Sequence, residues 1–249
     1  MGRRWFILAY GVSAYVLFLG VFLYAIGFIG NFGTPTTLDG EPRVSVGAAV
    51  GVNLVLLVLF AVQHSGMARP GFKRWVRRHI PDALERSTYV LATNVALLAM
   101  FALWQPLPGV VWRVESPAGR AALYTLFGIG WATVLVTTFL INHFDLFGLR
   151  QTWFGFRRRP YEPVPFVTPL PYRWVRHPLY VGWLTVFWAT PTMGLAHLLF
   201  AAGTTLYILG AIVLEERDLV AAHPEYEAYR RATPALLPRV RPRRVAARA

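Results

Sequence analysis

The sequence predicts an all-α, polytopic membrane helix bundle with about six spans. Only 15% of its 249 residues are charged and 55% are hydrophobic, whereas a soluble domain carries about 25% charged residues. Several apolar runs approach the ~20 residues that span a hydrocarbon core. Cysteine is absent, which excludes disulfides, thiolate metal ligands and cysteine nucleophiles.

The apolar runs expected to span the membrane are residues 5–29, 44–62, 87–104, 118–141, 179–189 and 195–214. The first run follows Arg3 and Arg4 as in a signal peptide, but it is too long for a cleaved apolar region and is expected to be retained. Gly128 and Gly130 would let the fourth span approach a neighbour closely. The fifth run is short, and residues 190–194 turn the chain into the sixth, so the last two runs form a hairpin.

The positions of the basic residues predict the orientation. With the N-terminus inside, all Lys and Arg residues except Arg43, Arg113 and Arg120 fall on the inner side, as the positive-inside rule requires. Both termini are therefore expected in the cytoplasm. The net charge of +13 is explained by this bias and by contact with the lipid bilayer, so no nucleic-acid partner is predicted.

Three segments follow from this organisation. Residues 1–142 form a four-span membrane bundle. Residues 143–231 contain a polar loop over the cytoplasmic mouth, the hairpin and a C-terminal helix. Residues 232–249 are basic and expected to be flexible.

Polar residues bracket the predicted hairpin. Arg176 and His177 precede it, and Glu215 and Glu216 follow it. Placing ionisable groups at a membrane boundary costs free energy, so their presence there suggests a functional site. An arginine fork beside a carboxylate suits a zwitterionic ligand, and the ring of Tyr180 could attract a sulfonium cation. A structural Arg–Glu pair that closes the hairpin would produce the same pattern, so both interpretations stay open.

The bracketing residues also resemble a known family. Arg-His-Pro-x-Tyr-x-Gly from Arg176, Glu-Glu-x-x-Leu from Glu215 and Tyr-x-x-Tyr from Tyr226 are similar to motifs of the isoprenylcysteine carboxyl methyltransferase superfamily of membrane enzymes. The resemblance implies a cytoplasmic site for S-adenosyl-L-methionine. The residues that it assigns to this cofactor are Arg176, His177, Pro178, Tyr180, Gly182, Glu215, Glu216, Tyr226 and Tyr229. His223-Pro224 departs from the pattern, since many relatives have an aromatic residue and a glycine there.

Residues 63–65 and 142–151 look more like the bacterial branch that contains methanethiol S-methyltransferases. This likeness implies methylation of a small apolar thiol, methanethiol, to dimethyl sulfide. Because a thiol reacts as its thiolate, a base near the cytoplasmic mouth is expected. The candidate catalytic residues are His143, Asp145, Asn142 and Arg150, with His64 behind them. His143 could instead be an interfacial residue that caps the end of the fourth span.

No metal site is predicted, because the six His residues lack close metal-ligand spacing. Dinucleotide fingerprints and P-loops are also absent from the sequence. Two alternatives to the thiol methyltransferase remain. One is a methyltransferase for a prenylated cysteine carboxylate or another lipid-like acceptor; the other is a non-catalytic membrane accessory protein of the same fold. An enclosed polar cleft between the bracketing residues would favour an enzyme, and a cleft filled by side chains would favour the accessory protein.

Overall fold

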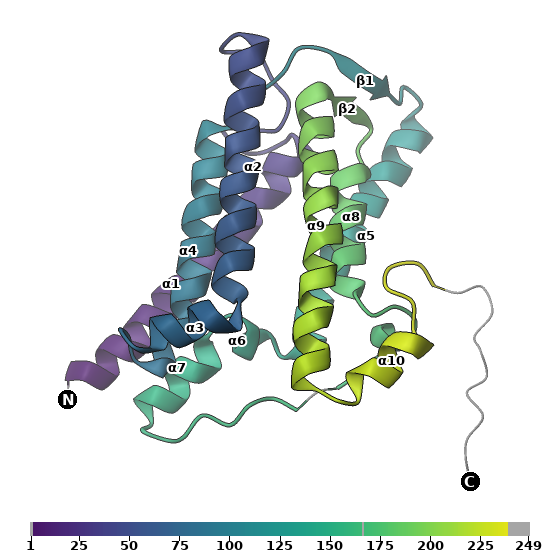
Figure 1. Cartoon of the computed structure of the whole chain (residues 1–249). Helices are drawn as coiled ribbons and strands as arrows, with labels where there is room; N and C mark the ends of the chain where they lie inside the picture. Colours follow the sequence, from purple (N-terminus) through teal and green to yellow (C-terminus); the bar gives the residue numbers. More distant parts are fainter. Residues whose placement is uncertain (1, 166, 239–249) are drawn as a thin grey trace.

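The computed structural model describes residues 2–165 and 167–238, and these residues are mainly helical (Figure 1). Among these residues, five helices are long and apolar enough to cross a membrane: α1 (Gly2–Gly30), α2 (Val46–Ala68), α4 (Asp82–Leu103), α5 (Pro117–Ile141) and α9 (Leu195–Ala222). They expose large apolar side chains such as Leu23, Val62 and Leu206, at 66%, 66% and 71%. Lipid is the solvent that suits such a surface. The chain is therefore an integral membrane protein, and the predicted all-α bundle is confirmed.

Shorter elements complete the fold. They are α3 (Pro70–Arg77), α6 (His143–Leu146), α7 (Leu149–Phe156), the 3-10 turn η1 (Leu170–Arg173), α8 (Pro178–Trp188), α10 (Tyr226–Ala232) and the strands β1 (Val110–Arg113) and β2 (Thr192–Gly194). Figure 1 shows α3, α7 and α10 at one end, which we call the basic end, and the strands at the other.

The predicted fifth span is not a helix of spanning length. α8 has 11 residues, which corresponds to ~16 Å at the rise of an α-helix. The chain then continues in extended form to β2, which pairs antiparallel with β1, Val110 opposite Gly194. Trp112 Nε1 donates to Thr190 O at 3.1 Å and adds a side-chain contact to this pair. The last hairpin is thus a short helix followed by an extended segment, and then the long α9.

α5 and α8 pack closely at two glycines. A Cβ placed on Gly182 would lie 2.9 Å from Val134 Cγ2 and 3.0 Å from the carbonyl oxygen of Gly130. The predicted close approach at Gly130 is confirmed. Gly128 differs, because a Cβ there would meet no atom within 4 Å.

Replacing Gly182 by alanine is expected to lower the melting temperature of the purified protein. The added methyl group would meet backbone of α5, which cannot rotate away as a side chain can, and overpacking of this kind costs about 1–3 kcal/mol. Thermal unfolding in detergent measures the effect. Gly128→Ala is the matched control and should melt as the wild type does. Equal melting temperatures for both variants would contradict the tight contact.

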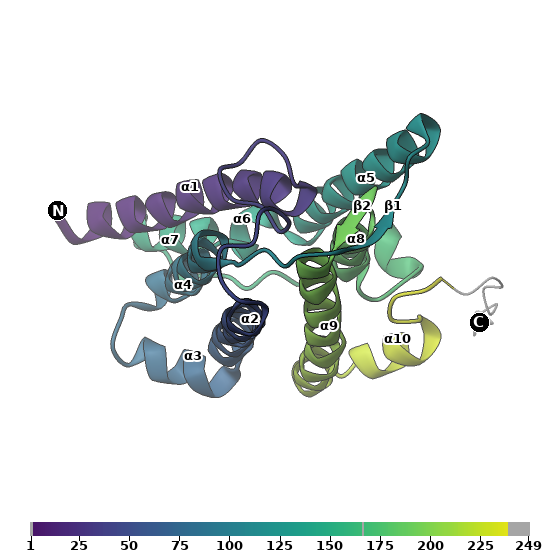
Figure 2. The ribbon, with the colours of Figure 1, turned by 90° about the horizontal axis from the view of Figure 1, so that it is seen from above.

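One hydrophobic core joins the predicted N-terminal bundle to the segment after residue 142. Phe28 of α1, Met100 of α4, Trp131 of α5, Val186 of α8 and Phe200 of α9 belong to the same cluster. Figure 2 shows α1, α2 and α4 on one side of the molecule and α5, α8 and α9 on the other. The groups of helices therefore do not follow chain order, since α5 packs on α8 while α7 packs on α1.

The predicted C-terminal helix is divided between the end of α9 and the short α10. α9 ends two residues before Pro224, because proline disfavours a helical conformation in the residue before it. Beyond α10, the backbone N–H groups of Arg176 and His177 donate to the carbonyls of Pro234 and Ala235 at 2.8 and 3.1 Å. The start of the predicted flexible tail is thus held against the start of α8. Residues 239–249 of that tail lie outside the described residues.

Candidate functional site

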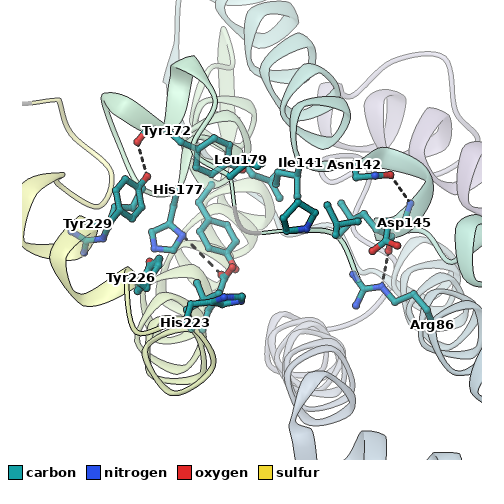
Figure 3. A pocket seen from close by; sticks show the side chains of 18 residues that line it. Arg86, Ile141, Asn142, Asp145, Tyr172, His177, Leu179, His223, Tyr226 and Tyr229 are labelled. Atoms are coloured by element: carbon teal, nitrogen blue, oxygen red, sulfur yellow. Dashed lines mark hydrogen bonds and ion pairs between the residues drawn. The ribbon is translucent and has the colours of Figure 1, made fainter. Parts of the chain in front are cut away.

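A cavity of about 300 Å³ opens at the basic end between the two groups of helices (Figure 3). This volume is at the lower end of the range for small-molecule sites. Eight of the predicted site residues line it: Asn142, Asp145, Arg176, His177, Tyr180, Glu215, Tyr226 and Tyr229. The tertiary fold therefore brings the two predicted clusters, which are far apart in sequence, to one cavity.

Arg176, His177 and Glu216 form a buried ionic cluster beside this cavity. Glu216 Oε1 accepts from Arg176 Nε at 2.7 Å and lies 2.9 Å from His177 Nε2. Arg176 Nη1 also donates to the carbonyl of Arg230 at 2.8 Å and to that of Thr233. The side chains of Arg176 and Glu216 are only 12% and 10% exposed. The structural Arg–Glu pair considered from the sequence is therefore present, and it ties α8, α9 and α10 together.

Glu215 faces the cavity, whereas Glu216 does not line it. Consecutive residues of an α-helix point about 100° apart, so the two carboxylates have different surroundings. Tyr180 OH donates to Glu215 Oε2 at 2.8 Å, and the Glu215 side chain remains 44% exposed. Glu215 thus presents an oriented carboxylate to a ligand.

Tyrosines form much of the wall around α10. Tyr226 and Tyr229 meet edge to face with ring centroids 5.6 Å apart. Tyr229 OH donates to the carbonyl of Tyr172 at 2.5 Å. Burial raises the pKa of Tyr226 to about 12 and also raises the pKa of Tyr172 and of Tyr229. These hydroxyls are therefore neutral at physiological pH. Tyr172 was not predicted, because no spacing in the loop distinguishes it.

The opposite wall is organised by Asn142, which lies between α5 and α6 with a φ of 135° and caps the start of α6. Its side-chain oxygen accepts from the backbone N–H of Asp145 at 3.2 Å. Asp145 Oδ1 accepts from Tyr161 OH at 2.7 Å and from Arg150 Nη1 at 3.4 Å. Burial, together with the bond to Asp145, raises the pKa of Tyr161 to about 12. The Asp145 carboxylate therefore lines the cavity while it is hydrogen bonded to Tyr161 and Arg150. Arg150 itself does not line the cavity.

His143 points away from the cavity toward α1. Its Nε2 lies 2.9 Å from Tyr15 OH, and its Nδ1 lies 2.8 Å from Thr138 Oγ1. The Phe139 ring stacks on the imidazole at 4.2 Å. The side chain is buried, and this burial lowers its pKa. Both ring nitrogens are engaged, as the interfacial interpretation of His143 anticipates.

The remaining predicted site residues support the wall rather than line it. Pro178 is buried in the first turn of α8, where the missing N–H of proline costs no hydrogen bond. Gly182 packs against α5. Within residues 2–165 and 167–238, no group of three or more His, Asp or Glu is placed to hold a metal ion.

Arg86 lines the cavity although it is not among the residues predicted for the site. α4 begins at Asp82, ahead of the predicted start at residue 87, and so carries Arg86 to the wall. Arg86 Nε donates to the carbonyl of Leu146 at 2.7 Å. Nothing in the sequence distinguishes this arginine from its basic neighbours, so only the fold reveals it.

Curated proteins resemble this chain over most of its length. It is 54% identical over 237 residues to a methanethiol S-methyltransferase of Mycobacterium tuberculosis, covering 95% of this chain and 97% of that one. The corresponding enzyme of Crocosphaera subtropica is 52% identical, covering 94% and 92%. Nurim of Bos taurus is 33% identical over 227 residues, with 86% of each chain covered. No protein-family model and no solved structure matches the chain.

Proposed function

Because the chain belongs to the family of the methanethiol S-methyltransferases, we propose that it transfers a methyl group from S-adenosyl-L-methionine to methanethiol, giving dimethyl sulfide. The observation that carries this proposal is the cavity, to which both Glu215 and Asp145 contribute. A cavity at this position favours an enzyme over a non-catalytic accessory protein. We further propose that the chain belongs to the isoprenylcysteine carboxyl methyltransferase superfamily, and that its basic end and both termini face the cytoplasm of a bacterial cell.

The residues on the α8, α9 and α10 side fit S-adenosyl-L-methionine. This molecule carries a sulfonium and an ammonium, and when bound it supplies an electrophilic methyl group. The Glu215 carboxylate, oriented by Tyr180, is positioned to hold the positive end. Neutral tyrosine rings at Tyr226 and Tyr229 suit a cation near their faces. The buried cluster of Arg176 with its partners would keep this wall in position.

The residues on the other side would position the acceptor and exclude water. Ile141 and Leu179 supply apolar surface beside Asn142 and Asp145. Val164, Pro165 and Val167 of the loop before η1 also line the cavity, as expected for a loop over the mouth. Methyl transfer depends chiefly on alignment of the reacting atoms and on a dry site. In this arrangement we assign His143 to positioning α6 through its contacts with Tyr15 and Thr138.

Purified protein in detergent, given labelled S-adenosyl-L-methionine and methanethiol, is expected to release labelled dimethyl sulfide into the headspace. Gas chromatography measures this product. Arg173→Ala, an exposed arginine just before the site, is the matched control and should retain activity. If a prenylated cysteine is labelled and methanethiol is not, the prenylated cysteine is the acceptor and the assignment of methanethiol is wrong. Failure to bind the methyl donor by titration calorimetry would contradict the methyltransferase itself.

A further inference from the structure

The proposed reaction needs methanethiol as an anion, because the thiolate is the nucleophile. The side chains predicted as proton acceptors are poorly placed for this task. His143 lies outside the cavity with both ring nitrogens engaged. Asp145 already accepts hydrogen bonds from Tyr161 and Arg150. A positive charge that stabilises the anion would serve the reaction equally well, since it favours ionisation of the thiol directly.

The described residues that line the cavity include two arginines, Arg86 and Arg176. The nitrogens Nε, Nη1 and Nη2 of Arg176 are all engaged, by Glu216 and by the carbonyls of Arg230 and Thr233. Arg86 is different, because its one hydrogen bond among the described residues runs from Nε to the carbonyl of Leu146. Its two terminal nitrogens, which carry most of the donors of a guanidinium, therefore remain available to a ligand.

We propose that Arg86 holds the methanethiolate sulfur as an electrostatic anchor, so that the thiol ionises on binding without a side-chain base. This inference rests on the proposed function. The S–H bond breaks and its proton passes to water at the open end of the cavity. A sulfur lone pair then forms the new bond to the methyl carbon while the sulfonium C–S bond breaks. The products are neutral dimethyl sulfide and S-adenosylhomocysteine, so atoms and charge balance.

The position of Arg86 suits the acceptor. Figure 3 shows Arg86, Asn142 and Asp145 on one side of the cavity and His177 and Tyr226 on the other. If the methyl donor occupies the second side, the acceptor must approach from the first, because the displacement is in line. The cavity also takes apolar side chains from α5 and α6, Ile141 and Leu146. Such surface suits the single methyl group of methanethiol.

A polar stack behind Arg86 holds its orientation. The guanidinium carbon lies 5.0 Å from the centre of the Tyr89 ring, within the range of a cation–π contact. Tyr89 OH lies 2.9–3.0 Å from the two ring nitrogens of His64. His64 in turn stacks on Phe60 at 5.2 Å and lies 3.2 Å from Thr93 Oγ1. His64, a candidate base from the sequence, is thus placed as a positioning residue that acts through Tyr89.

Arg86 lies among several titratable and charged groups. On its own helix α4 is Tyr89, and His64 lies on α2. Lys73 lies on α3. Burial of its amine and, next in size, the nearby positive charge of Arg86 both lower the pKa of Lys73. Asp145 on α6 and Glu215 on α9 share the cavity. Asp145 is partnered by Arg150, and Glu215 would face the positive end of the methyl donor, so neither cancels the charge of Arg86 at the acceptor.

The test is the pH dependence of kcat/KM for methanethiol in Arg86→Gln and Arg86→Lys. If Arg86 favours the thiolate, activity rises with pH, and Arg86→Gln moves this rise to higher pH by one to two units. At neutral pH the loss would be about 10- to 100-fold, since each pKa unit is a factor of ten in the ionised fraction. Arg86→Lys should restore part of it. The affinity for S-adenosyl-L-methionine, measured by calorimetry, should change by less than about twofold, because Arg86 lies on the acceptor side of the cavity and independent sites couple weakly.

Arg74→Gln is the matched control, because this exposed arginine on α3 carries the same charge outside the cavity. A small fluorinated thiol, which ionises more readily than methanethiol, should lose much less activity in Arg86→Gln. If Arg86→Gln does not fold, Arg86→Lys is tested with methanethiol and with the fluorinated thiol. Its pH profile should shift in the same direction by a smaller amount.

Three results would overturn the assignment. The first is an unchanged pH profile in an active Arg86 variant. The second is an equal loss for both thiols, which indicates a purely structural arginine. The third is a loss confined to affinity for S-adenosyl-L-methionine, which would mean that Arg86 binds the carboxylate of the methyl donor. A wild-type protein without activity on any thiol would instead overturn the proposed function, and the inference with it.

Discussion

Replacing Arg176 by alanine is expected to abolish binding of S-adenosyl-L-methionine and to destabilise the protein by about 3–5 kcal/mol, the usual cost of leaving one member of a buried ion pair without its partner. Glu216 would keep a carboxylate that is 10% exposed and has lost its guanidinium. The carbonyls of Arg230 and Thr233 would also lose their donor. The contact between α8, α9 and the end of α10 should therefore loosen, and with it the tyrosine wall.

Titration calorimetry and thermal unfolding in detergent measure the two effects. Arg173→Ala is the matched control, since Arg173 is exposed. A second variant, Glu216→Gln, separates charge from shape, because the amide retains an acceptor for Arg176 while removing the ion pair. Intact cofactor binding in Arg176→Ala would refute a role for this cluster in holding the site.

Replacing Glu215 by glutamine is expected to weaken binding of S-adenosyl-L-methionine about 10- to 100-fold while leaving the melting temperature unchanged. A hydrogen bond to a charged group contributes about 1.5–3 kcal/mol, which corresponds to this range. The side chain is 44% exposed, so little buried packing is lost, and the amide can still accept from Tyr180. The contrast with Arg176→Ala follows from the two environments of the neighbouring carboxylates.

S-adenosylhomocysteine, which lacks the sulfonium charge, tells which cation Glu215 holds. Equal weakening for both molecules would place the ligand ammonium at Glu215, whereas weakening for S-adenosyl-L-methionine alone would place the sulfonium there. Glu227→Gln on α10, whose carboxylate pairs only with Arg230 and Arg231 among the described residues, is the control. Unchanged affinity for both molecules would remove Glu215 from the proposed site.

The local pattern was sufficient for the long helices and for part of the cavity lining. The spans α1 and α5 are recognisable as long apolar runs. In lipid each span must satisfy its backbone polar groups within its own helix, so it has to be one continuous helix. The polar residues at the ends of the hairpin meet because only the short extended segment 189–194 joins α8 to α9. Tyr180 and Glu215, 35 positions apart, are hydrogen bonded for that reason. The length of the apolar runs and the shortness of their connection therefore predict that the two ends of the hairpin meet, but not which side chains pair there.

Other features depend on rotation about a helix axis and on contacts between distant segments. The sequence cannot tell that Glu216 turns to Arg176 while Glu215 faces the cavity. Nor can it tell that His143 points to Tyr15. The sequence of α8 is a continuous apolar run, but the segment after it forms β2, which pairs with β1. The sequence does not predict this pairing, because β1 comes from a distant loop and meets β2 only in the folded chain.

By itself, then, the sequence determined a membrane-spanning helical bundle and a polar region at the end of its last hairpin, because hydrophobic length and the placement of charge are local properties. Only the tertiary structure decided which polar groups pair with one another and which face the cavity. Arg86 illustrates the difference. It is one of many basic residues in the sequence, but its place at the cavity arises from α4 packing beside α2 and from a single hydrogen bond to α6.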